Sequence, residues 1–365
     1  MARELTIVSG GILFYRLFDV AWEIDLKGLD EKLRESRRLS IERKLFSKAF
    51  EFANPPVSIR LSNLTATLDG RTMEAHAYAK FYDYGVVSVI LDFPARGMSM
   101  GEYASLALHL RHKQPLEEYF RTELRRLVED LKDAMEAVKI SPLEEDYTVY
   151  HLRALEPALT AEELLAGIDL GELMLAEEGE LPPGRARIEE LLASRYSYSD
   201  RDLVLINWDN ALLLEPSASM DIPDLLEFAH AQLLELRVYD QILNKELDAI
   251  YASISPGVRI PFWGIKRYEE LAARVTRIIA ELTEITEKVD NSLKVTEDVY
   301  YARIYAAAVS LFKVGQWEDD IRRKIALASR VYDMLYREIA NRRTEALEVV
   351  IVLLIALEIV LFFFD

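Results

Sequence analysis

The stretch 5–24 alternates between apolar and polar residues or runs apolar with aromatic residues, which is typical of a β-strand. Thr72–Tyr82 is a further strand-like run, and Val86–Phe93 is rich in β-branched residues and ends at Pro94, so both also predict strands. Leu64–Leu68 is separated from Thr72–Tyr82 by Asp69 and Gly70, a dipeptide that favours a hairpin turn. The first hundred residues therefore predict strands that pair with their neighbours in sequence.

Further strands and several helices complete this region. Three more segments predict strands: Thr148–Leu152, Leu203–Trp208 and Ala211–Leu214. Helical spacing of apolar residues predicts helices over 28–52, 100–112 and 115–139, and short helices over 160–194. Because locally paired strands with helices between them are typical of the α+β class, we predict an α+β body over residues 1–215.

The pattern changes to a helical one after residue 216. A helix is expected from Asp221, whose side chain can cap it, to about Ile254. In two later segments apolar residues recur with alternating spacings of four and three, which is the heptad pattern of coiled coils. The first seam is Leu271, Val275, Ile278, Leu282 and Ile285, and the second contains Ile321, Ile325, Leu335 and Ile339. We therefore predict a helical coiled-coil region over 216–343, with a hinge near Gly315.

Residues 346–364 form an apolar run that contains only Glu348 and Glu358 as charged residues. Nineteen helical residues would extend ~28 Å, close to the thickness of the hydrocarbon core of a bilayer. This run predicts one transmembrane helix over 344–365, and the alternative is a buried helix of a soluble protein. The expected span includes Leu347, Glu348, Val349, Leu353, Leu357, Glu358 and Phe364.

The flanks of the run predict an orientation and a location. Arg337, Arg342 and Arg343 precede it and no basic residue follows, so the positive-inside rule places the N-terminal body in the cytoplasm. The first twenty residues do not have the pattern of a secretory signal peptide. The sequence therefore predicts a single-pass, tail-anchored protein of a bacterial or archaeal inner membrane, with the lipid bilayer as a partner.

Charge and composition restrict the classes of partner. With 44 basic and 62 acidic residues the formal net charge is −18, which argues against direct binding of nucleic acid. Much of the negative charge lies in 142–190, a stretch that is either a solvated acidic face or a docking surface for a basic protein. The chain contains no cysteine, which excludes disulfides, thiolate zinc sites and a cysteine nucleophile.

Motifs for catalysis are not found. Glu227 and His230 have the spacing used in di-metal helical bundles, but no second Glu-x-x-His is available, so we interpret both as structural. His109 and His112 have no carboxylate at ligand spacing and are interpreted in the same way. The two common glycine-rich loops that bind phosphate, G-x-x-x-x-G-K-[ST] and G-x-G-x-x-G, do not occur in the sequence. We predict no enzyme activity, no cofactor and no metal.

The residues 319–360 and the segment AKFYDYGVVSVILDF resemble the conserved-domain family of the required-for-meiotic-nuclear-division proteins. Arg343, Leu347, Glu348 and Glu358 match the family's terminal pattern, and Gly85-Val86-Val87 matches its strand. Val349 departs from the aromatic residue that the family usually has there. The resemblance implies a bacterial-type member of a family that has no established enzyme activity, whose mitochondrial members support organellar translation at the inner membrane.

Taken together, these patterns predict a membrane-tethered, self-associating scaffold or interaction protein that forms a homo-oligomer. Two other functions remain open at this point. One is a membrane tether for ribosomes or RNA, as in the mitochondrial family members. The other is an enzyme whose pocket lies in the α+β body and is not revealed by motifs.

Overall fold

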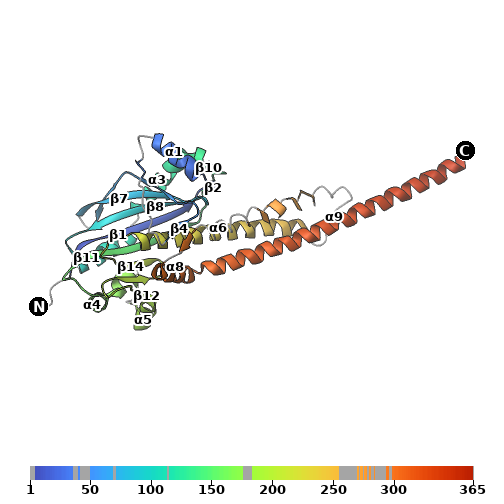
Figure 1. The fold of residues 1–365 in the computed structure, drawn as a ribbon. Helices are drawn as coiled ribbons and strands as arrows, with labels where there is room; N and C mark the ends of the chain where they lie inside the picture. The colour runs from blue at the N-terminus through green and yellow to red at the C-terminus, as the bar shows by residue number, and fades with distance from the viewer. Residues whose placement is uncertain are drawn as a thin grey trace. The chain divides into compact units, whose positions relative to one another are not determined.

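The computed structural model (Figure 1) describes residues 5–35, 40–41, 50–68, 71–112, 115–175, 183–254, 298–364 and parts of 269–295. The chain divides into two compact units. The first contains Met1–Val238 and Val289–Gly315, and the second contains Tyr239–Lys288 and Gln316–Asp365.

An eleven-stranded sheet forms the centre of the first unit. Its order is β12-β13-β14-β11-β1-β8-β7-β5-β3, with β6 beside β7 and β9 beside β1. In chain order the strands of this sheet are β1 (Thr6–Asp19), β3 (Ser40–Ile41), β5 (Val57–Arg60), β6 (Leu64–Leu68), β7 (Arg71–Phe81), β8 (Val86–Ala95), β9 (Met98–Ser99), β11 (Glu144–Glu156), β12 (Arg195–Tyr196), β13 (Leu203–Ile206) and β14 (Asn210–Leu214). Two small sheets pair β2 (Glu23–Ile24) with β10 (Met135–Glu136), and β4 (Phe50–Phe52) with β15 (Leu293–Val295).

One face of the large sheet carries the main apolar core. Because successive side chains of a strand point to opposite faces, Ala75, Ala77, Ala79 and Phe81 of β7 all point to this side. The core is covered by short helices that lie between or after the strands in sequence. They are α1 (Leu26–Glu35), α2 (Met100–His112), α3 (Pro115–Leu131), α4 (Ala161–Gly167) and α5 (Arg185–Ala193), together with a 3-10 turn (Lys132–Ala134) and a π-helical turn (Gly171–Leu175).

The opposite face of the sheet packs against α6 (Asp221–Ile254). Every residue from Ile222 to Leu236 is buried, so this part of the helix has no solvent-facing stripe. The helix α8 (Val299–Leu311) contacts it too, since Tyr305 of α8 donates a hydrogen bond to Gln232 at 2.5 Å. The consequence is that polar residues in this part of α6 are enclosed by protein.

The body is a mixed α/β domain with a large mixed sheet, and the predicted α+β class is therefore corrected. Among the described strand pairs, β11 and β14 are parallel and the others are antiparallel. The physical reason is the long connection from β11 to β13, which contains α4 and α5. Such a crossover is long enough to bring β14 beside β11 in the same direction, a pairing that local sequence does not report.

The predicted hairpin of β6 and β7 is confirmed by their antiparallel pairing from Leu64 opposite Ala75 to Leu68 opposite Arg71. The predicted end of the 115–139 helix is wrong, since α3 stops at Leu131 and Met135–Glu136 form a strand. The helix predicted over 28–52 is also too long, because Phe50–Phe52 form β4. The helix α8 and the next helix, α9 (Val314–Phe364), are separated at Lys313, which has a φ of 58° and lies close to the hinge predicted near Gly315.

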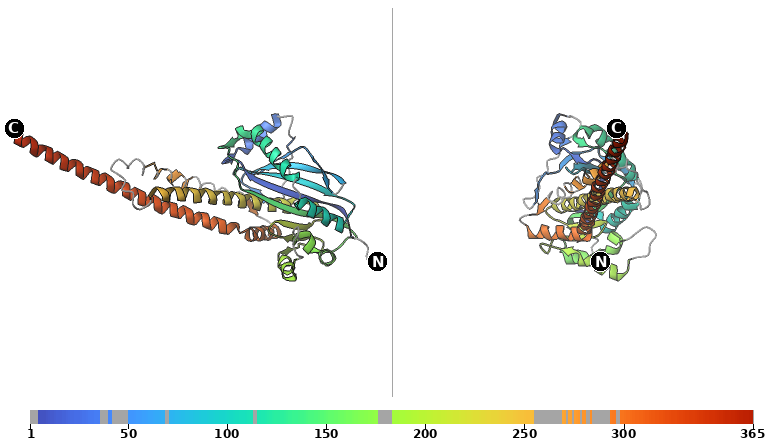
Figure 2. Two further views of the ribbon diagram at one scale, coloured as in Figure 1. Left: turned by 180° about the vertical axis from the view of Figure 1, so that it is seen from behind. Right: turned by 90° about the vertical axis from the view of Figure 1, so that its right-hand side faces the viewer.

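The second unit contains the last part of α6 and most of α9 (Val314–Phe364), a helix of 51 residues. Leu247 of α6 and Val275 pack with Ala328 and Val331 of α9 in a small apolar cluster. Lys324 of α9 also lies 2.5 Å from Asp240 of α6. The left view of Figure 2 shows these parts of α6 and α9 running side by side.

Within the residues that the structure describes, no helix has the length and apolar character needed to cross a membrane. The predicted transmembrane helix over 344–365 is therefore wrong, and so is the single-pass, tail-anchored membrane location derived from it. Glu348 and Glu358 interrupt the apolar run, so its longest uncharged stretch is Val349–Leu357. As a helix this stretch extends ~14 Å, about half of a hydrocarbon core.

Candidate functional site

Lys80 of β7 lies at the centre of a buried cluster of charges. Its side chain is 2% exposed and its Nζ is 3.0 Å from Asp224 Oδ1. Lys80 also donates a hydrogen bond to Glu227, which is fully buried. The two carboxylates belong to the first turns of α6, where a spacing of three residues places them on one helix face. The cluster therefore joins the polar face of the sheet to the start of α6.

The cluster keeps its lysine charged. Burial alone would lower the pKa of Lys80, but the charges of Asp224 and Glu227 and their hydrogen bonds outweigh it and raise that pKa. Burial raises the pKa of Glu227, while the charge of Lys80 opposes this rise. Lys80 is consequently a permanent cation at neutral pH, held by acceptors on α6.

A cavity of about 190 Å³ lies beside this cluster. Its lining includes the buried side chains of Tyr15, Ser58 and Lys80 and the half-buried side chain of Arg153. The remaining lining residues are Leu13, Tyr78, Ile90, Asp92, Met220 and Asp224. The volume corresponds to about six water molecules at ~30 Å³ each, so the cavity has room for a small molecule.

Two hydrogen-bond donors in this lining lack an acceptor among the described residues. They are the hydroxyl of Tyr15, a residue only 2% exposed, and Nε of Arg153. Burial, followed by the charges of Glu227 and Asp224, raises the pKa of Tyr15 well above its ordinary value. Tyr15 is therefore a neutral phenol that can donate. Since buried donors are normally satisfied, these two groups give the cavity an unmet requirement for an acceptor.

His230 occupies the same face of the sheet, one turn beyond Glu227 on α6. Its ring lies between Tyr147 and Phe312, with centroid distances of 4.2 and 4.1 Å. Burial lowers the pKa of His230 to about 3, so the imidazole is neutral. Across the described residues, no group of three or more histidine, aspartate or glutamate side chains has an arrangement that could hold a metal ion. The geometry thus gives Glu227 an ion-pair role and His230 a packing role.

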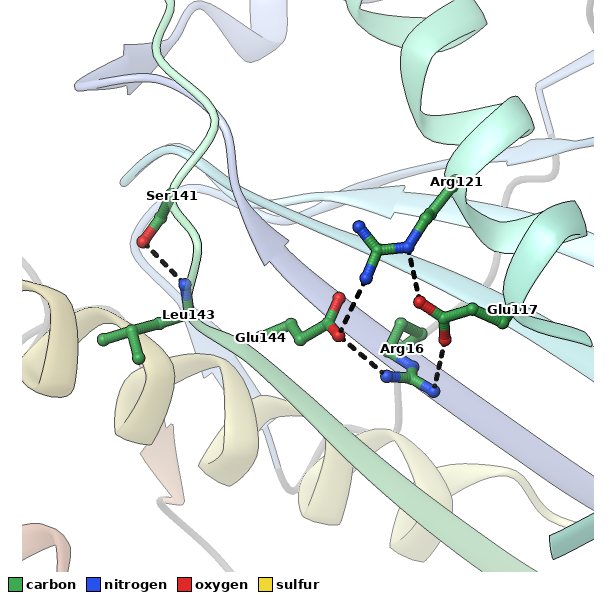
Figure 3. A network of polar contacts seen from close by, with 6 residues as sticks. All are labelled: Arg16, Glu117, Arg121, Ser141, Leu143 and Glu144. Carbon is green, nitrogen blue, oxygen red and sulfur yellow. Dashed lines mark hydrogen bonds and ion pairs between the residues drawn. The ribbon is translucent and has the colours of Figure 1, made fainter. Parts of the chain in front are cut away.

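A second, larger pocket of about 760 Å³ is lined by residues of β1, α3 and β11. Figure 3 shows its ionic network, in which Arg16 and Arg121 face Glu117 and Glu144. Arg16 lies 3.1 Å from Glu144 and 3.2 Å from Glu117, and Arg121 lies 2.5 Å from Glu117. Both arginines are already matched by carboxylates, so this pocket has a weaker requirement for a ligand than the cavity beside Lys80.

The predicted seam residues are placed only in part. Val275 and Ile321 are fully buried, and Ile325 is half-buried on α9. Leu271, Ile278, Leu282 and Ile285 fall outside the described residues. Leu335 and Ile339 lie in α9, where the structure describes the helix but not their side chains. The heptad seam therefore stays a prediction.

The residues predicted for the membrane span lie in the last part of α9. Leu347, Val349, Leu353 and Leu357 are between 54% and 64% exposed. Glu348 and Glu358 are exposed as well, and Phe364 is the last residue of the helix. Of the flanking arginines, Arg337 and Arg343 are exposed, and Arg343 lies 2.5 Å from Glu269. Arg342 lies in the same helix.

Sequence reasoning did not find the cavity residues Lys80, Tyr15 and Arg153. A signal was present in β7, where the alternate residues His76, Tyr78 and Lys80 are polar or aromatic and the intervening ones are small and apolar. A second signal was the pair of carboxylates, Asp224 and Glu227, among the apolar residues at the start of α6. Both patterns indicate a polar layer between a sheet and a helix.

Comparison with known proteins identifies relatives of this chain. Residues 9–221 match a family model described as "Uncharacterized protein MJ0711, N-terminal domain". The uncharacterised protein MJ0711 of Methanocaldococcus jannaschii is 28% identical over 177 residues, which cover 48% of this chain and 53% of that protein. The chain thus spans about half the length of this curated relative. No solved structure matches the chain.

Proposed function

Starting from the fact that this chain belongs to the family of the MJ0711 N-terminal domain, we propose that it is a self-associating interaction protein. The observation that carries the proposal is the exposed apolar segment of α9, defined as Leu347–Leu361. Eleven of its side chains are large, aliphatic and between 47% and 64% exposed. A continuous apolar surface of this kind marks an interaction site in a protein.

A second copy of the same chain is the partner that fits this segment. The exposed side chains occupy consecutive positions and so surround the helix, which suits a bundle of identical helices better than one groove. Burying the half of each side chain that remains exposed contributes ~1 kcal/mol, or about 10 kcal/mol for the segment. This is comparable with the cost of bringing two chains together, so a bundle can form.

The test is the molar mass of the full chain in solution, measured by light scattering after size exclusion. We expect a multiple of the 41.9 kDa chain. Leu353→Glu, at a position 63% exposed, places a charge in the bundle and should give a monomer. Ala326→Glu, the same change at an exposed position earlier in α9, is the control and should keep the oligomer.

Three outcomes would overturn the proposal. They are a wild-type monomer, an oligomer that survives Leu353→Glu, and flotation with phosphatidylcholine vesicles without any increase in mass. Salt-sensitive co-sedimentation of a monomer with ribosomes would instead favour the RNA tether. The net charge of −18 supports self-association over that tether, since phosphate binding needs clustered cations.

We also propose that the acidic stretch 142–190 docks a basic protein, because it holds much of the negative charge of the chain. Its exposed carboxylates include Glu162, Glu172 and Glu189. Charge reversal of these three residues should abolish pull-down of a basic partner from crosslinked extracts. Retention of the same partner by the reversed variant would refute the docking surface.

A distant relationship to the required-for-meiotic-nuclear-division proteins, as a bacterial-type member, is a separate proposal. It is supported by Gly85, the last residue of the turn between β7 and β8, and by Val86 and Val87, the first residues of β8. Gly85 has a φ of 91°, a conformation that favours glycine. A solved structure of such a protein should show the strand order β11-β1-β8-β7 with glycine at this turn. A different order would separate the two families.

A further inference from the structure

The exposed apolar segment Leu347–Leu361 carries its charges on one side of the helix. Its charged residues are Glu348 and Glu358, which are ten residues apart in the sequence. At 3.6 residues per turn this separation places them ~80° apart around the helix axis. Ile355 lies between them on this side, and Leu353 lies opposite the midpoint between them. The segment therefore has one face with charges and one face without.

The face opposite the glutamates consists of small and large aliphatic side chains. We call it the uncharged face, and it contains Val349, Val350, Leu353, Ala356 and Leu357. Val349 is 55% exposed and Leu357 is 54% exposed, so these side chains remain largely in contact with solvent within one chain. Apolar residues that recur every three or four positions form the face by which one helix packs against another.

The uncharged face continues a seam that the chain itself buries earlier in α9. Val349 follows Ile321, and Ala356 follows Ala328, by four whole heptads. In a left-handed coiled coil a seven-residue repeat stays on one side of the helix. Ile321 and Ala328 are buried within the chain, whereas Val349 and Ala356 are exposed. The seam is thus covered at its start and uncovered at its end, where a further helix can pack on it.

We propose that Glu348 and Glu358 restrict self-association to the uncharged face, so that the uncharged faces of two copies cover each other and the assembly closes as a dimer. This inference rests on the self-association proposed above, and it specifies the surface and the partner. A contact made by the same patch on both copies is closed, because each patch is used once. Packing through the opposite side would bury unpaired carboxylates among apolar side chains, which is costly. In the closed dimer the glutamates of both copies stay in water.

The first test places a glutamate at two neighbouring positions on opposite faces of the full chain. Leu353 lies on the uncharged face and is 63% exposed, and Ile355 lies between the two glutamates and is 52% exposed. We expect light scattering after size exclusion to give the wild type twice the 41.9 kDa mass of one chain. Leu353→Glu should halve this mass. Ile355→Glu should leave it unchanged, because the new charge joins a face that stays in water.

Cysteine crosslinking compares the same two positions without adding a charge. The chain has no cysteine, so one introduced thiol can form a disulfide only with that of a second copy. Leu353 and Ile355 each lie one residue from Leu354, the midpoint of the segment, so each stays close in height to its equivalent in a parallel or an antiparallel pair. Under mild oxidation Leu353→Cys should form the linked dimer at least ~10-fold faster than Ile355→Cys, because cysteines whose Cα atoms are more than ~7 Å apart cannot be bridged.

Combining Glu348→Leu with Glu358→Leu tests the restriction itself. Both glutamates are exposed, so this variant should fold. Its molar mass should rise above that of the wild-type dimer, because a second apolar face becomes available. A wild-type monomer would overturn self-association as a whole. The restriction to one face is overturned, with self-association intact, by any of four results: a wild type larger than a dimer, dissociation by Ile355→Glu as by Leu353→Glu, equal crosslinking rates of the two cysteine variants, or an unchanged mass of the double leucine variant.

Discussion

Replacing Lys80 by methionine tests the energetic importance of the buried charge cluster. Methionine fills a similar volume without the charge, so the main change is the loss of a cation between Asp224 and Glu227. These carboxylates are 7% and 0% exposed. Removing one partner from a buried ion pair typically costs 3–5 kcal/mol, and here two carboxylates lose their partner. We therefore expect a loss of about 5 kcal/mol in the free energy of unfolding.

The dependence of this loss on pH gives a second check. Without Lys80, burial and mutual repulsion should hold the pKa values of both carboxyls above those of the unfolded chain. A raised carboxyl pKa means that the folded state binds more protons, so the variant should gain stability as the pH falls. The difference between Lys80→Met and wild type should consequently be smaller at pH 5 than at pH 8.

Urea unfolding followed by circular dichroism at both pH values measures these quantities. Lys32→Met is the control, since Lys32 is 41% exposed and pairs with the 74% exposed Asp133 at 2.8 Å. Loss of such a surface pair should change stability by less than ~1 kcal/mol. The triple variant Lys80→Met, Asp224→Asn, Glu227→Gln should recover most of the stability. A loss below ~1 kcal/mol for Lys80→Met, or a deficit that does not shrink at low pH, would refute the reasoning.

Three further predictions concern other parts of the first unit. Burial lowers the pKa of His230 from 6.5 to about 3, so protons bind preferentially to the unfolded chain and the wild type should lose ~2 kcal/mol in its free energy of unfolding as the pH falls from 7 to 5. His230→Phe should not show this loss. Equal acid sensitivity of variant and wild type in urea titrations would contradict this. Gly85→Ala should cost ~3 kcal/mol or more, since φ is 91° and a Cβ would overlap the carbonyl oxygen of Ala21. Melting within 2 °C of wild type would show that the turn adapts. Thr160→Ala removes the capping box with Glu163 at the start of α4 and should cost about 1 kcal/mol in chemical denaturation. An unchanged unfolding midpoint would mean that this cap does not contribute.

Local patterns in the sequence were enough to predict those strands and helices whose own residues carry the signal. The strand-like run Thr72–Tyr82 predicted β7, and in the structure alternate side chains of this strand meet the core and the polar face in turn. Asp69-Gly70 predicted the hairpin with β6 for the same kind of local reason. Asp221, as a residue that can cap a helix, likewise predicted the start of α6, which the structure shows over Asp221–Ile254.

Only the tertiary structure decided which elements meet. The parallel pairing of β11 with β14 depends on a crossover longer than any local pattern. Lys80 and Asp224 are separated by 144 residues, and no period or motif links a strand lysine to a helix carboxylate at that distance. The cavity with Tyr15 and Arg153 exists for the same reason, since its walls come from segments that contact each other only after the sheet has closed against α6. The period of a pattern indicates which face of one helix or strand is buried. It does not indicate which other helix or strand packs against that face.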